Sequence, residues 1–132
     1  MKNIIAVIVG LIVGSAVNMG FILLNPLVID LPEGVDVSNM DNLKNTMHLF
    51  QPKNFIFPFL AHAVGTLVGA IVASLIAKSH KMRLAFVIGF VFLAGGLYNA
   101  YALPAPLWFI ALDIIAAYIP MAYIGGLIGA KK

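Results

Sequence analysis

The chain contains four apolar runs, and each has about the length needed to cross a membrane. The runs cover residues 4–25, 54–77, 84–103 and 106–129. A helix needs about 20 apolar residues to span roughly 30 Å of hydrocarbon. Of the whole chain, 62% is hydrophobic and only 10% is charged, whereas soluble domains carry about a quarter charged residues. The sequence therefore predicts an all-α integral membrane protein, a four-helix bundle formed by a single domain of residues 1–132.

The first run also has features of a cleaved signal peptide. Lys2 precedes the apolar stretch, and Ser15 and Val17 are small residues near a position where cleavage would occur. However, the run continues through Phe21 and on to Pro26, which is longer than the 7–15 apolar residues typical of a signal peptide. We therefore expect the first run to be a transmembrane helix.

The basic residues predict how the bundle is oriented in the membrane. Six of the eight lie beside the N-terminus, the second connection and the C-terminus: Lys2, Lys78, Lys81, Arg83, Lys131 and Lys132. The first connection carries only Lys44 and Lys53 beside four acids, and the third connection, 103–106, has no charge. Basic residues accumulate in cytoplasmic loops. We therefore expect both termini on the cytoplasmic side of a bacterial inner membrane, with every copy oriented alike.

The first connection, residues 26–53, is predicted to contain a short amphipathic helix at about 39–50. Ser38 and Asp41 have the spacing of a capping box, and Pro52 ends the pattern. At 100° per residue, one face of this helix is apolar and consists of Met40, Leu43, Met47 and Phe50. Two placements fit this pattern, because the helix could lie on the outer membrane surface or cover the end of the bundle.

Few polar residues lie inside the predicted spans. Those singled out as candidate site residues are Asn18, His62, Asn99 and Asp113, one from each span. Each lies 16 to 18 residues from a basic residue at the inner end of its helix, which is about 24–27 Å along the axis. The sequence therefore predicts a single polar layer in the outer part of the membrane, which is a candidate ion-binding site.

The four polar residues differ in how strongly each one indicates a functional role. Asparagine and histidine in membrane helices commonly form hydrogen bonds between helices, which is a purely structural role. Asp113 differs because an ionised carboxylate at this depth costs about 3 kcal/mol. We expect it to be either protonated or paired with His62.

Small residues accompany the polar groups on the helix faces, and we expect them to form helix contacts. In the second span, Gly65 and Gly69 have the spacing of a close membrane helix contact. Pro120 leaves the carbonyl of Ala116 without its usual helical donor. The residues assigned to helix packing are Gly10, Gly14, Gly65, Gly69, Gly89, Gly96 and Pro120.

The sequence shows no pattern typical of an enzyme or a metal site. It contains no cysteine, and one histidine with one aspartate falls short of an ordinary metal ligand set. No phosphate-binding loop, HExxH or GxSxG motif occurs. We therefore expect no metal, no cofactor and no catalysis. The bases flank the apolar runs instead of clustering on a polar face, so nucleic acid is not expected as a partner.

Two segments carry a resemblance to known sequences. They are HLFQPKNFIFPFLAHAVGTLVG at 48–69 and AYIPM at 117–121. Through them the chain resembles a group of uncharacterised small four-helix bacterial inner-membrane proteins, and this resemblance implies the topology but no activity. The chain departs from small multidrug-resistance exporters, which need a glutamate in the first helix, and from fluoride channels, whose broken third helix it lacks.

Two classes of function follow from these features. The first is a non-catalytic accessory or assembly subunit, whose small-residue faces and outer helix dock on a larger membrane complex. The sequence favours this class. The alternative is a small oligomeric transporter or channel that uses the polar layer with a protonatable aspartate and histidine. The expected partners are the lipid bilayer and either further copies of the chain or a larger complex.

Overall fold

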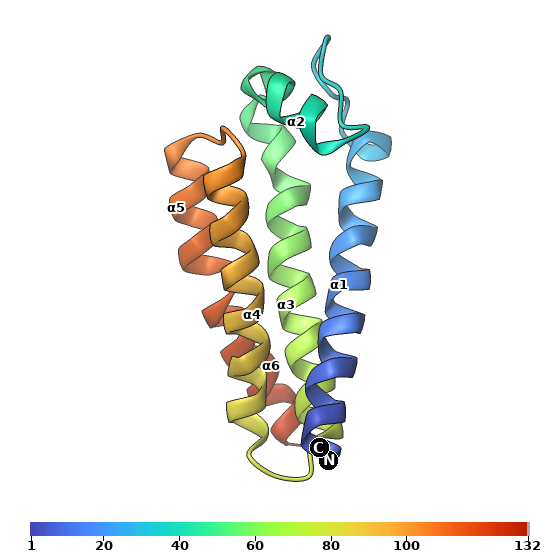
Figure 1. The fold of residues 1–132 in the computed structure, drawn as a ribbon, viewed down its shortest axis with the longest axis vertical. Helices are drawn as coiled ribbons and strands as arrows, with labels where there is room; N and C mark the ends of the chain where they lie inside the picture. Colours follow the sequence, from blue (N-terminus) through green and yellow to red (C-terminus); the bar gives the residue numbers. More distant parts are fainter. Residues whose placement is uncertain (132) are drawn as a thin grey trace.

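The structure, a computed structural model, describes residues 1–131, and these contain helices but no strand. Four apolar helices are long enough to cross a membrane: Lys2–Val28, Pro52–Ile76, Lys81–Ala102 and Leu107–Ala130. They pack side by side as a bundle, with both chain ends at the same end of it (Figure 1). The all-α fold with four apolar helices is thus confirmed, and the chain is a multi-pass membrane protein. Lys132, one of the expected cytoplasmic anchors, lies outside the described residues.

The spans are close to the predicted ranges but differ at their ends. Helix α1 is Lys2–Val28 and therefore continues beyond Pro26, where we expected it to stop. A short 3-10 helix, η2 (Pro52–Phe55), leads into α3 (Ile56–Ile76), and α4 is Lys81–Ala102. The fourth span consists of two helices, α5 (Leu107–Ala116) and α6 (Ile119–Ala130).

Helix α3 lies at the centre of the bundle. It packs against α1, α4 and α6, whereas α1 has only a small contact with α4 (Figure 1). At the end that holds the termini, the side-chain oxygen of Asn3 accepts a hydrogen bond of 3.0 Å from the N–H of Lys78. The N-terminus is therefore tied to the connection between α3 and α4.

Glycines allow α1 and α3 to approach at backbone distance. A Cβ added to Gly10 would lie 2.8 Å from the carbonyl oxygen of Gly69, and one added to Gly14 would lie 2.7 Å from that of Gly65. Similarly, a Cβ on Gly89 of α4 would lie 2.6 Å from the Cβ of Ala122 in α6. The structure thus places these glycines at helix crossings, where lipid-embedded helices gain van der Waals contact.

The break in the fourth span corrects one expectation. We predicted one continuous helix over 106–129, but the helix is interrupted at Ala117 and Tyr118. Pro120 has no N–H for the carbonyl of Ala116, and its ring disfavours helical geometry at the residue before it. Pro120 itself is exposed, and its assignment to helix packing stays a prediction.

The segment between α1 and α3 forms a lid over one end of the bundle. It contains α2 (Met40–Thr46) and a 3-10 helix, η1 (Met47–Leu49). The side chain of Asn39 caps α2 by accepting from the N–H of Asn42, so the cap is Asn39 and not Ser38 as predicted. The hydroxyl and backbone N–H of Ser38 instead bond to Asp36 and lower the pKa of that exposed carboxyl.

An aromatic cluster joins the lid to the bundle. The ring of Phe55, which is buried, lies 5.3 Å from the ring of Phe50 and 4.5 Å from that of Phe109 in α5. Trp108 meets Phe55 edge to face at 5.7 Å. The side-chain nitrogen of the fully buried Asn54 also donates to the carbonyl of Asp30. These contacts fix the start of α3 against the end of α1 and the start of α5.

Candidate functional site

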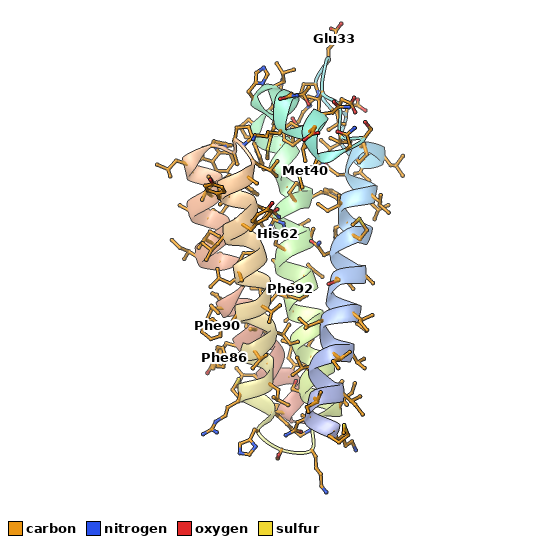
Figure 2. The ribbon with its side chains drawn as sticks, viewed as in Figure 1. Glu33, Met40, His62, Phe86, Phe90 and Phe92 are labelled. Atoms are coloured by element: carbon orange, nitrogen blue, oxygen red, sulfur yellow. The ribbon has the colours of Figure 1, made fainter. Side chains whose placement is uncertain are left out.

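His62 of α3 and Asp113 of α5 form a close pair inside the bundle. The Nδ1 atom of His62 lies 2.8 Å from Oδ1 and 2.9 Å from Oδ2 of Asp113. The two side chains are 17% and 6% exposed. Figure 2 shows His62 inside the bundle towards the lid, below Met40 in this view. Of the two states expected for Asp113, the structure has the arrangement in which it pairs with His62.

The pair can exist in two charge states. When Nδ1–H donates to an ionised Asp113, the other imidazole nitrogen, Nε2, decides the net charge. With Nε2 unprotonated the pair carries one negative charge, and with Nε2 protonated it is neutral. Both charge states keep the hydrogen bond between Nδ1–H and the carboxylate.

Tyr118 completes this cluster, although the sequence analysis did not single it out. Its hydroxyl donates to Oδ2 of Asp113 at 3.2 Å. Its ring stacks on the His62 ring with centroids 5.7 Å apart. Tyr118 lies five residues after Asp113, which is off the helical face of the aspartate. It reaches the cluster because the helix breaks there and because Gly96 has no Cβ, since one would overlap the tyrosine hydroxyl.

A cavity of about 300 Å³ lies between the pair and the lid. Its polar lining comes from Asn25, His62, Asn99 and Asp113. The buried Oδ1 of Asn25 has no hydrogen-bond partner among residues 1–131. Most of the other lining side chains are apolar, and they include the whole apolar face of the lid: Met40, Leu43, Met47 and Phe50. Of the two placements predicted for this segment, the structure favours the one that covers the bundle. We call this space the outer cavity.

A second, smaller cavity of about 110 Å³ lies on the other side of the pair, which we call the inner cavity. It lies between α1, α3 and α4, and its polar lining comes from Asn18, His62, Thr66, Asn99 and Tyr118. The oxygens Asn18 Oδ1 and Thr66 Oγ1 are buried without a hydrogen-bond partner in the described part of the chain. His62 and Asn99 line both cavities.

The structure thus places all four predicted polar residues around two adjacent cavities. Only His62 and Asp113 bond to each other, while Asn18 and Asn99 line the cavity walls. Thr66, which sequence reasoning missed, lies one helical turn after His62, and this spacing could have revealed it. Asn25 was missed because we expected the first helix to end there.

The described residues contain no group of three His, Cys, Asp or Glu side chains that could hold a metal ion. No protein-family model matches the sequence, and neither a curated protein nor a solved structure matches it. The chemistry of the site therefore has to be inferred from its geometry. That geometry places a histidine–aspartate pair beside a mostly apolar chamber.

Proposed function

We propose that this protein binds a small organic cation in the outer cavity and carries it across the membrane in exchange for a proton on the His62–Asp113 pair. The observation that supports this proposal is the position of the pair, which forms the polar wall of an otherwise mostly apolar cavity. The proposal places the protein in a bacterial inner membrane with both termini cytoplasmic, as the basic residues suggest. The outer cavity then faces the side opposite the cytoplasm.

The charge of the pair favours a cation over an anion or a neutral molecule. With a neutral imidazole, the pair carries one negative charge inside the membrane, and an uncompensated carboxylate costs about 3 kcal/mol there. Either a proton on Nε2 or a monovalent cation in the cavity removes this cost. The two are alternatives, because the pair carries only one negative charge, and cation binding should therefore release a proton.

The size and lining of the outer cavity favour a small, largely apolar ligand. Its volume of about 300 Å³ is at the lower end of the range for small-molecule sites, about 300–1,000 Å³. Such sites are mostly apolar and use a few polar groups to orient the ligand. Here the unpaired oxygen of Asn25 supplies an acceptor on the wall formed by α1.

Binding of benzyltrimethylammonium to the purified protein in detergent tests the proposal. This probe is permanently charged, so any pH dependence belongs to the protein. We expect its affinity to fall as the pH is lowered, because protons compete for the pair. Asp113→Asn should weaken binding about 100-fold, because it removes the buried negative charge whose cost of about 3 kcal/mol the bound cation offsets. Isothermal titration calorimetry in buffers of different ionisation enthalpy measures both the affinity and the proton released.

Two controls make this test specific. Asp41→Asn removes a carboxylate from the exposed face of the lid and should leave the affinity unchanged. Neopentylbenzene, which has the shape of the probe without its charge, should bind without releasing a proton. The proposal is contradicted if the probe binds the Asp113→Asn protein as tightly as the wild type, or if its affinity is independent of pH. In proteoliposomes, a proton gradient should drive probe movement through the wild type only.

A second candidate function is the accessory subunit that the sequence favoured. It is supported by small residues on the outward face of α1, where Ala16 and Gly20 are exposed at the spacing of a membrane helix contact. A Cβ at Gly20 would meet no atom of this chain within 4 Å. Native mass spectrometry after gentle extraction decides this candidate. A second polypeptide in fixed stoichiometry supports it, and the chain alone contradicts it.

A further inference from the structure

The inner cavity contains polar atoms that the protein itself leaves without partners. Thr66 is 1% exposed, and its hydroxyl has no hydrogen-bond partner in residues 1–131. The side-chain oxygen of Asn18 is also buried and also has no hydrogen-bond partner among these residues. Both residues line the inner cavity, as does His62. Burying a hydroxyl or an amide without a partner is costly, and native structures usually resolve this with bound water.

The inner cavity is large enough to hold water and lies where water would reach the histidine. At about 110 Å³, it exceeds the roughly 10–15 Å³ that one water needs. Its lining includes five polar side chains, whereas cavities that stay empty are lined by apolar residues. Thr66 follows His62 by one turn of α3, so the cavity lies on the side of the pair that faces the chain termini.

The pairing with Asp113 determines which atom of His62 is available to this water. Nδ1 is within hydrogen-bond distance of both carboxylate oxygens. Among the described residues, His62 makes its side-chain hydrogen bonds through Nδ1 alone, which leaves Nε2 without a protein partner. It is therefore the nitrogen that can gain or lose the proton, because the hydrogen bond made by one ring nitrogen determines the role of the other.

Beyond the inner cavity, towards the termini, the bundle is packed and apolar. Ala70, Ala73, Ala85, Ile88 and Ala122 form a fully buried cluster there. Gly10 and Gly69 cross next to the same cluster, where a Cβ on either would lie 3.1–3.2 Å from Ile88. Water in the inner cavity therefore has no open path to that end of the bundle in this conformation.

We propose that the inner cavity is a hydration site, in which waters held by Thr66 and Asn18 hydrogen-bond to Nε2 of His62 and deliver its exchangeable proton. A hydrated proton in the cavity transfers to the lone pair of Nε2, and the reverse step returns it to water. The site is closed on the side of the termini by the apolar cluster, so the water forms a reservoir and not a continuous channel. The role of this water in the exchange of a proton for a cation rests on the proposed function. The presence of the water in the inner cavity does not.

Water-edited solid-state NMR of the protein in lipid bilayers, with labelled histidine and no cation probe, tests this inference. Magnetisation should pass from water to the His62 ring in the wild type. Thr66→Val keeps the side-chain volume but removes the hydroxyl, and we expect it to slow this transfer at least about threefold, because an apolar cavity holds less water. Thr66→Ser keeps the hydroxyl and should retain the transfer.

The outcomes separate this inference from the proposed function. A His62 ring that receives no magnetisation from water in the wild type means a dry site and overturns the inference. Wild-type transfer that is unchanged in Thr66→Val means that water reaches His62 from the outer cavity, which also overturns it. The valine variant is expected to fold, because it replaces a hydroxyl without a protein partner by a methyl group, and its thermal midpoint checks this. Both NMR results are obtained without the cation probe, so they do not depend on whether the outer cavity binds it.

Discussion

Replacing His62 by alanine is expected to lower the free energy of unfolding of the bundle at pH 7 by about 3–5 kcal/mol, which is the usual cost of breaking a buried ion pair. The substitution leaves Asp113 buried with only the hydroxyl of Tyr118 as a partner. It also removes the ring on which Tyr118 stacks. Unfolding by increasing sodium dodecyl sulfate in dodecyl maltoside micelles, followed by circular dichroism, measures the change.

Two further variants test the cause of this loss. Adding Asp113→Ala to His62→Ala should recover part of the stability, because it removes the unpaired carboxylate. His48→Ala changes an exposed histidine on the lid and should alter stability by no more than about 0.5 kcal/mol. A loss below about 1 kcal/mol in His62→Ala would show that the pair contributes little, since that is the size of an exposed ion pair.

Gly14→Ala is expected to destabilise the bundle by about 1–3 kcal/mol through overpacking. The added Cβ would lie 2.7 Å from the carbonyl oxygen of Gly65 and 2.9 Å from the ring of Phe92. Since the first of these is a backbone atom, α1 and α3 must separate to accept the methyl group. The same detergent titration measures the effect.

Gly20→Ala is the matched control for this change. It adds the same methyl group to the same helix, at a position where no atom lies within 4 Å. Because alanine is a better helix former than glycine, this variant should be as stable as the wild type or more stable by up to about 1 kcal/mol. Equal destabilisation by the two substitutions would show that close packing of α1 on α3 does not explain the role of Gly14.

The spans could be predicted from sequence because a bilayer imposes one simple requirement, a long apolar helix. The break at Ala117 and Tyr118 could not, because hydropathy does not change there. Pro120 was visible in the sequence, but its effect depends on the surroundings, since proline in a membrane helix can produce either a kink or an interruption.

The candidate site was only partly predictable for a related reason. His62 and Asp113 stood out because polar residues are rare inside apolar runs, and the helix rise gave their depth. Tyr118 did not stand out, since the regular helix we assumed turns it away from Asp113. The cavities and the unpaired oxygens of Thr66 and Asn18 depend on how side chains fill the space between helices, which no periodicity encodes.

The pairing of His62 with Asp113 across two spans has a consequence for biogenesis. His62 lies in the second span and Asp113 in the fourth, so the histidine enters the membrane before the aspartate during translation. When Asp113 follows, we expect α3 to present the imidazole that becomes its hydrogen-bond partner. We therefore expect the last span, which carries the residue most costly to insert, to enter the membrane beside its partner, so that the order of synthesis favours assembly.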